Sequence, residues 1–230
     1  SAVFVDDHVY QAVVKHPIFS SLSSCFSHLY DHEFLVRCRS GLLTHAQLRR
    51  FMIQHQHYSK HFLRYLFLLM SRLNHVEDTK HLLHNVLEEM GMEDEHTVPH
   101  TILQNEMLRE LGVMQVSELP LPETKCLIDR MTQYCEDQNP LIGLSALCLG
   151  AEAIVPIVYS AVYHAACFLG YTDQQLKYLQ LHVECDDGHA LTMYQIILRR
   201  IGSSPEMARH VVAVAQQMMR LRQDFLTAVL

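Results

Sequence analysis

The sequence has few of the residues that interrupt helices, since its 230 residues include only 8 Gly and 7 Pro. These glycines and prolines fall mostly between segments whose apolar residues recur with the period of a helix. Alternation of apolar and polar residues nowhere lasts long enough to predict a sheet. We therefore expect an all-α fold, a single domain over residues 1–230 with seven or eight helices.

Paired cysteines and targeting signals are also missing. The 7 cysteines are irregularly spaced and form no CxxC pair, which argues against a disulfide framework and a zinc ribbon. An odd, scattered set of cysteines favours a reduced protein of the cytoplasm. Residues 1–7 do not place a basic region before an apolar stretch, so no signal peptide is predicted. No apolar run approaches the roughly 20 residues that a membrane span needs.

Positive charge is scarce, whereas histidine is abundant. The formal net charge is -7 and no run of Lys or Arg occurs, so neither nucleic acid nor a membrane surface is an expected partner. Apolar residues make up 49% of the chain and charged residues 19%, which favours a packed core over disorder. The 17 histidines nearly equal the 18 Lys and Arg together.

The predicted helical segments follow one another with short connections. In chain order they are 6–38 (broken near Pro17), 44–73, 76–90, 94–111, 123–136, 139–169, 172–200 and 202–230. Thr44 is the expected N-cap of the second segment, and Gly91 ends the third. Pro99 is tolerated early in the fourth segment, and Pro156 is expected to kink the sixth.

Three side chains in the segment 172–200 form the first candidate for a metal site. His182, Asp186 and His189 are separated by four and three residues, so they share one face of a helix. Two imidazoles and a carboxylate are good ligands for iron, manganese or zinc. In a chain so rich in histidine, the same triplet also arises by chance on a solvated face.

A second candidate ligand is Glu152, which is the one charged residue in the apolar stretch 141–163. A carboxylate in a buried helix is costly unless it is paired or bound to a cation. Pairing with an Arg or Tyr, or protonation, is the alternative explanation. Because a ligand triplet follows on a later helix, metal binding is the preferred one.

The third candidate lies in the acidic turn at residues 87–96. Glu88 or Glu89 ends one predicted helix and His96 begins the next, so both could reach one point across the turn. Glu93 and His96 form a rival pair, with the spacing found in helical di-iron proteins. An acidic turn of this kind is also typical of solvated surface. His57 and His61 share a face of segment 44–73, where a hydrogen-bonded histidine is favoured over a role in supporting ligands.

Taken together, these elements resemble the haem-oxygenase-like di-iron oxidases, which share an all-helical fold with the thiaminase-II and pyrroloquinoline-quinone-biosynthesis proteins. The stretch 57–65 is similar to the aromatic helix of that family. The resemblance implies two Fe²⁺ ions, with manganese or a mixed Mn/Fe pair as alternatives, and Glu152 as a bridge. The implied ligands are Glu89, His96, Glu152, His182, Asp186 and His189.

The resemblance also implies an enzyme that uses O2 to oxidise a small, partly apolar substrate in a biosynthetic pathway. An external electron donor and a homodimer remain open. Some N-oxygenating members add a glutamate from the second helix, but no acidic residue occurs between Glu33 and Glu77. Oxidative C–C cleavage or desaturation is therefore favoured over N-oxygenation.

Two further functional hypotheses stay open. One branch of the family consumes its own tyrosine and lysine to make para-aminobenzoate, but the segment 139–169 offers no lysine after Glu152. The alternative to a di-iron oxidase is a cofactor-independent, thiaminase-like enzyme or a non-redox helical binding protein, in which these residues form a structural polar network.

Overall fold

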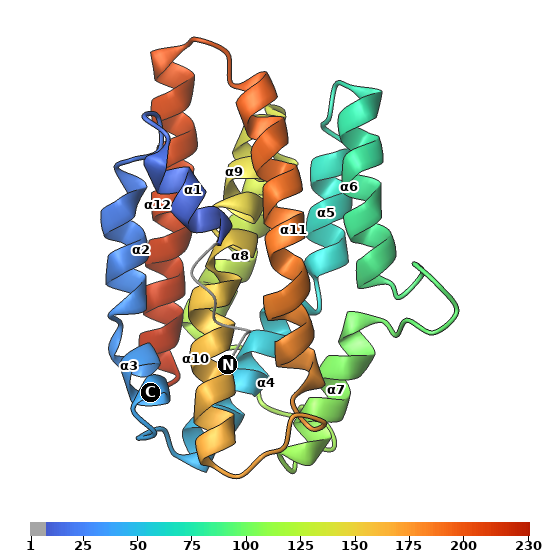
Figure 1. The fold of residues 1–230 in the computed structure, drawn as a ribbon, viewed down its shortest axis with the longest axis vertical. Helices are drawn as coiled ribbons and strands as arrows, with labels where there is room; N and C mark the ends of the chain where they lie inside the picture. Colours follow the sequence, from blue (N-terminus) through green and yellow to red (C-terminus); the bar gives the residue numbers. More distant parts are fainter. Residues whose placement is uncertain (1–7) are drawn as a thin grey trace.

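The computed structural model describes residues 8–230, except for the side chains of residues 184–187 (Figure 1). Helices are its regular elements, and no β-strand occurs in this described part of the chain. In chain order the elements are α1 (Val9–Lys15), α2 (Leu22–Tyr30), α3 (Glu33–Arg39), α4 (His45–Ser59), α5 (Phe62–Met70), α6 (Val76–Glu89), α7 (His100–Glu110), α8 (Pro122–Glu136), α9 (Pro140–Cys148), η2 (Glu152–Ile154), α10 (Val155–Phe168), α11 (Lys177–Arg200) and α12 (Pro205–Ala228). The prediction of an all-α fold is confirmed.

The described residues form more helices than the seven or eight expected. The predicted segment 6–38 contains α1, α2 and α3, and the segment 44–73 contains α4 and α5. The segment 139–169 contains α9, η2 and α10. Apolar periodicity continues across such short breaks, so the sequence pattern does not reveal them.

Two predicted helix ends are confirmed. The Thr44 hydroxyl accepts a hydrogen bond from the Gln47 backbone N–H at 3.1 Å, and the Gln47 side-chain carbonyl accepts one from the Thr44 N–H at 3.0 Å. This reciprocal pair is a capping box that begins α4. Gly91 follows the end of α6 with a φ of +68°, and a Cβ there would lie 2.5 Å from the Pro99 nitrogen. The turn therefore needs glycine, and it returns the chain to the start of α7.

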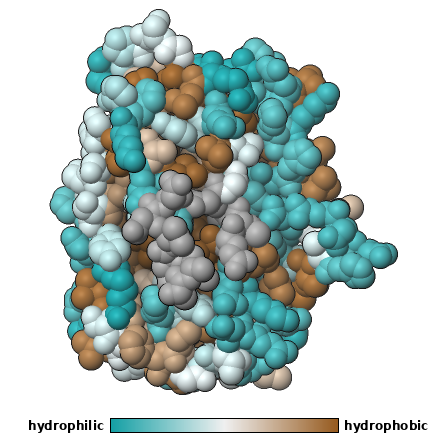
Figure 2. Space-filling view, viewed as in Figure 1, coloured by the Kyte–Doolittle hydropathy of each residue, from teal (hydrophilic) through white to brown (hydrophobic). Residues whose placement is uncertain are grey.

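The start of α7 differs from the prediction. The helix begins at His100 rather than near Asp94, and Pro99 is its N-cap residue with a ψ of 138°. Proline disfavours the helical conformation in the residue before it, so Val98 cannot lie within the helix. The residues before Pro99 instead form a loop that protrudes from one side of the molecule (Figure 1) and is mostly hydrophilic (Figure 2).

The apolar segment at the centre of the sequence is also the centre of the fold. Every residue from Leu141 to Tyr159 is buried, with α9 packed on α8, α11 and α12 and α10 packed on α3 and α11. Contrary to the expectation from the sequence, the segment Pro140–Phe168 is long and apolar enough to cross a membrane. Its most apolar 18-residue window is entirely buried inside the protein, so the segment occupies the position of a core helix.

A break in this central segment places Glu152. The expected kink at Pro156 is wrong, because α9 ends at Cys148 and Pro156 lies in the first turn of α10. At Gly150 the chain passes against α12, where an added Cβ would lie 2.5 Å from the Met218 Cβ. The three residues after Ala151 form η2, with Glu152 first and 2% exposed. A carboxylate is thus held at an irregular point in an otherwise apolar core.

Candidate metal centre

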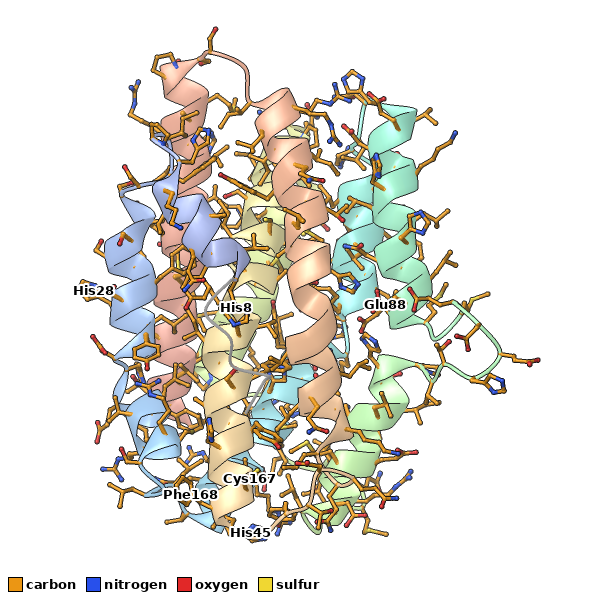
Figure 3. All side chains as sticks on the ribbon, in the orientation of Figure 1. His8, His28, His45, Glu88, Cys167 and Phe168 are labelled. Atoms are coloured by element: carbon orange, nitrogen blue, oxygen red, sulfur yellow. The ribbon has the colours of Figure 1, made fainter. Side chains whose placement is uncertain are left out.

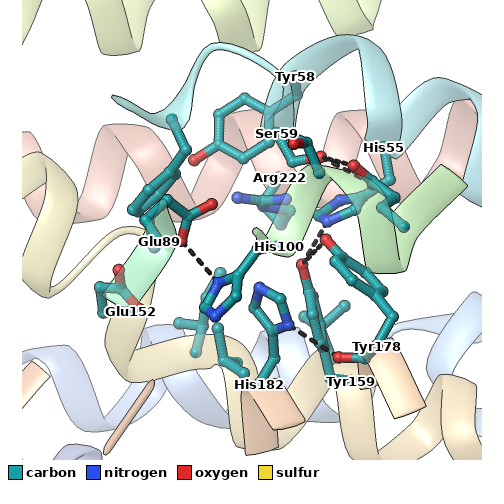
Figure 4. A pocket seen from close by; sticks show the side chains of 17 residues that line it. His55, Tyr58, Ser59, Glu89, His100, Glu152, Tyr159, Tyr178, His182 and Arg222 are labelled. Carbon is teal, nitrogen blue, oxygen red and sulfur yellow. Dashed lines mark hydrogen bonds and ion pairs between the residues drawn. The ribbon is translucent and has the colours of Figure 1, made fainter. Parts of the chain in front are cut away.

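Three side chains from three helices converge in the core beside η2 (Figure 4). Glu89 is the last residue of α6, His100 is the first of α7, and His182 lies in α11. One ligand atom from each of them lies within 4.8 Å of the other two. The Glu89 Oε2 and His100 Nδ1 atoms are 2.8 Å apart, and the two side chains are 11% and 4% exposed. The donor atoms are close enough to share one cation.

The His182 ring is held in the form that binds metals. Its Nδ1 lies 2.8 Å from the carbonyl oxygen of Tyr178, one helical turn earlier. A hydrogen bond donated there leaves the other ring nitrogen, Nε2, with its lone pair available. Burial, followed by the nearby His100, lowers the pKa of His182 to about 4. The imidazole is therefore neutral at pH 7, as a ligand must be.

Glu89, in contrast to His182, is held in its charged form. Its burial favours the protonated acid, but the hydrogen bond from His100 and the charges of His100, His182 and His189 outweigh burial and lower its pKa. The carboxylate is thus held in its charged form beside two imidazoles, which is a donor set that suits iron, manganese or zinc.

A second group of donors adjoins the first. The His189 Nε2 atom is 2.5 Å from the Glu88 Oε2 atom, and the His189 Nδ1 atom is 4.0 Å from the Glu152 Oε1 atom. Figure 3 shows Glu88 at the end of α6, on the side toward α11. Glu152 and Glu89 line the same cavity, so the two groups face a shared space. The side chain of Asp186 lies outside the described residues, and its predicted role is not addressed by the structure.

The structure does not bring His96 into this centre. His96 lies on the exposed loop before α7, 86% exposed, with Glu95 as its near neighbour at 3.4 Å. His100 takes the place that the sequence analysis gave to His96, because α7 begins at His100, directly after Pro99. Of the three glutamates left open, Glu89 joins the cluster, Glu88 contacts His189, and Glu93 is exposed on the loop. Pro99 was the signal in the sequence for this start, since the helix begins at the residue that follows it.

A small cavity adjoins the donors, with a free volume of about 40 Å³, enough for a few atoms. Its walls combine apolar and polar side chains, namely His55, Tyr58, Ser59, Phe62, Thr101, Gln104, Ala151, Ile154, Val155, Val158, Tyr159, Tyr178 and Arg222, in addition to Glu89, His100, Glu152 and His182. Phe62 and the start of α10 contribute its apolar side chains.

Tyrosines and a histidine form a hydrogen-bonded chain along one wall of the cavity. His55 of α4 hydrogen-bonds to the Tyr159 hydroxyl, which lies 3.2 Å from the Tyr178 hydroxyl. Burial and the charge of Arg222 hold the pKa of His55 well below its usual value, so the ring is neutral. His57 is a hydrogen-bonded histidine, as the sequence favours, with its Nε2 atom 2.7 Å from the Glu118 carbonyl oxygen and away from the cluster. Arg222, which lies on the buried face of α12, is also a wall residue that sequence reasoning missed.

An all-helical bundle with a group of carboxylates and imidazoles in its core is an arrangement on which helical proteins can build a metal site. Residues 49–223 match a family model described as iron-containing redox enzyme, with a haem-oxygenase-like fold. The chain therefore belongs to this family, and it is an oxidoreductase. The match includes all the donor residues described above.

Relatives and solved structures agree with this assignment. The chain is 26% identical over 169 residues to a protein of Chlamydia trachomatis named 4-aminobenzoate synthase, a match that covers 71% of each chain. It superimposes with a TM-score of 0.74 on a protein of unknown function with a haem-oxygenase-like fold from Shewanella denitrificans, at 20% identity over 98% of this chain and 93% of the other. A TenA homologue from Pseudomonas syringae gives the same TM-score at 15% identity, covering 96% and 93% of the two chains.

Proposed function

We propose that the chain is a non-haem di-iron oxidase, which uses O2 to oxidise a small organic substrate. Glu89, His100 and His182 would hold one ion. Glu152 and His189 would serve the second, joined by Asp186 from its place on the same helix as His182. The iron would supply the electrons that reduce O2, with an external donor restoring the ferrous state.

The observation that carries this proposal is the convergence of Glu89, His100 and His182 from separate helices, with both histidines buried and the Glu89 side chain 11% exposed. A structural polar network would be expected to pair its members fully, whereas His182 keeps one ring nitrogen directed away from its backbone partner. The protein residues have three tasks there. They keep the His182 imidazole neutral, hold the Glu89 carboxylate ionised, and exclude bulk water from the reacting substrate.

The reaction class we favour is oxidative C–C cleavage or desaturation rather than N-oxygenation. Helix α4 contributes His55 to the cavity and contains no acidic residue that could add a further ligand. Apolar side chains of Phe62 and α10 line the remaining wall, which suits a substrate with an aliphatic or aromatic part.

A second candidate function is 4-aminobenzoate synthesis, which the names of the Chlamydia relatives suggest. Tyr58, Tyr159 and Tyr178 line the cavity, but the described wall contains no lysine. Synthesis from the chain's own side chains would leave a mass change in the protein. Iron-loaded protein exposed to O2 should therefore be examined by mass spectrometry, both for free 4-aminobenzoate and for a modified tyrosine.

The proposal predicts that anaerobic titration with Fe²⁺ loads about two ions per chain. Exposure of the loaded protein to O2 should then produce a transient absorption in the visible range. His182→Ala should abolish most of the loading without loss of helical circular dichroism, because the residue is a donor within 5 Å of two others. Wild-type protein that binds no iron would rule out the di-iron function.

A matched pair of variants tests the choice between two histidines. His100→Ala should reduce iron loading, whereas His96→Ala should leave it unchanged, because His96 lies on the exposed loop. Metal analysis of protein purified from medium containing both iron and manganese would identify the metal that is bound. The reverse result, with loading lost only in His96→Ala, would restore the assignment made from the sequence.

A further inference from the structure

Arg222 occupies a core position on α12. The buried face of this helix is otherwise apolar, with Met218 one turn before Arg222 and Phe225 and Leu226 one turn after it. Arg222 is itself only 4% exposed, and it lines the cavity beside the metal centre (Figure 4). An arginine is almost never fully buried unless it is paired.

The pairing that would explain a buried arginine is absent from the described part of the chain. The ion pairs found there do not include Arg222. Its Nε has no hydrogen-bond partner, and the guanidinium lies over the Tyr58 ring, with 4.6 Å from Cζ to the ring centroid. This cation–π contact compensates only part of the lost hydration of the charge.

The other groups around the cavity do not neutralise Arg222. His55, its close neighbour, is neutral. The carboxylate of Glu89 pairs with His100 instead, and Glu152 lies near His189. With Glu88 beside His189, the four carboxylates at the centre would carry as much negative charge as two ferrous ions carry positive charge. Metal loading would therefore leave no negative charge for Arg222, whose own charge would remain in excess.

We propose that Arg222 binds the anionic group of the substrate, which is a small organic acid with an apolar remainder. The guanidinium would donate two parallel hydrogen bonds to a carboxylate, and Phe62, Val155 and Val158 would contact the apolar part. Arg222 is thus a specificity-determining residue, which holds the acid beside the reacting centre. The inference rests on the proposed function for what happens to the acid there, although its binding can be measured without iron.

The experiment compares straight-chain acids with their amides on metal-free protein. Acetate and propionate, each paired with acetamide or propionamide, are titrated while two-dimensional NMR spectra are recorded. The wild-type protein should bind each acid about 10-fold or more tightly than its amide, because a charge-assisted pair replaces an unpaired cation. Arg222→Gln should reduce this ratio to about one.

Arg220→Gln is the matched control. Arg220 lies two residues away on the exposed face of the same helix, so this variant removes the same charge without changing the cavity. It should retain the preference for acids. Equal binding of acids and amides by the wild-type protein would overturn the inference, and so would an unchanged preference in Arg222→Gln.

Arg222→Met covers the case in which Arg222→Gln fails to fold. If the arginine is an uncompensated buried cation, an apolar side chain of similar length should raise the melting temperature of the ligand-free protein while removing the preference for acids. A lower melting temperature with an unchanged preference would make Arg222 structural and refute the inference. Iron titration of the same variants separates the two proposals, since failure to bind iron in all of them would refute the di-iron function without affecting the comparison of acids with amides.

Discussion

Asp78 of α6 shows what a fully compensated buried charge looks like in this fold. The residue is 1% exposed, and its carboxylate accepts hydrogen bonds from Arg200 Nε at 2.8 Å and from Arg199 at 3.4 Å. Burial raises the pKa of Asp78, but the hydrogen bonds and charges of the two arginines lower it by more. These contacts of Asp78 with Arg199 and Arg200 join the start of α6 to the end of α11, far from the metal centre.

Asp78→Asn should lower the free energy of unfolding at pH 7 by about 1–3 kcal/mol, because two arginines lose their charged partner. The folded pKa of Asp78 is lower than that of the unfolded chain, so its contribution is complete above about pH 4 and is lost as the pH falls through the folded value. Urea unfolding followed by circular dichroism at pH 7, 5 and 3 should show a difference between wild type and variant that shrinks only at the lowest pH.

Glu77→Gln provides the control for this prediction. Glu77 contacts the same Arg200 at 2.7 Å, but its side chain is 68% exposed. An exposed ion pair contributes little, so Glu77→Gln should change stability by less than about 0.5 kcal/mol. Equal effects of the two substitutions would show that burial of Asp78 does not determine its contribution.

At the scale of single elements, α11 was predictable and α7 was not. The spacing of His182 and His189 places both on one face of a helix, and the structure puts both in the core. His96 was chosen because the fourth helix was expected near Asp94, whereas Pro99 sets its start. A shift of a helix start by a few residues exchanges one histidine for another, and local sequence rules do not fix helix ends more closely than that.

The break between α9 and η2 yields a prediction for one glycine. Gly150→Ala should destabilise the protein by about 1–3 kcal/mol, because the new Cβ would overlap α12 and the core has no room to relax. It should also disturb the position of Glu152 two residues later. Thermal unfolding followed by circular dichroism measures the first effect, and Fe²⁺ titration measures the second.

The same substitution at Gly188 should act in the opposite direction. Gly188 lies exposed within α11, and a Cβ there would meet no atom within 4 Å. Alanine in a helix interior is favoured over glycine, so Gly188→Ala should stabilise the protein by about 0.5–1 kcal/mol. A loss of stability at Gly188 would contradict the open surroundings that the structure gives this position.

At the scale of the whole molecule, the donors belong to four elements: α6, α7, η2 and α11. A metal bound by all of them would cross-link the bundle and bind the folded state alone. Free Fe²⁺ at about 100 times its Kd should therefore stabilise the protein by about 2.7 kcal/mol and raise the Tm by about 5–10 °C under anaerobic conditions. Differential scanning calorimetry with and without a chelator measures this shift.

The shift should disappear in His182→Ala and persist in His96→Ala. An increase of equal size in both variants would mean that iron binds elsewhere. The measurement does not depend on turnover, so it tests the metal site separately from the chemistry.

The all-α fold could be predicted from the sequence, whereas the residues that surround the site could not. Helical periodicity and scarce glycine and proline were enough for an all-α bundle, and Glu152 was recognised as a charge in an apolar stretch. Arg222 was not predicted as a residue of the site, because α12 also carries Arg209 and Arg220, both of which are exposed. Which of several arginines lies against the cavity depends on how α12 packs, and this tertiary contact has no local signature.

The turn at Gly91 has a consequence for how such proteins are found and engineered. Glu89 and His100 are fixed by two helix ends, while the chain between them leaves the core and returns. Doubling the length of a flexible loop costs only about 0.6 kcal/mol, so residues inserted near Glu93 would leave both donors where they are. A search pattern with a fixed gap between the glutamate and its histidine would therefore miss proteins with the same centre, and this loop is a natural place to attach a tag or a second domain.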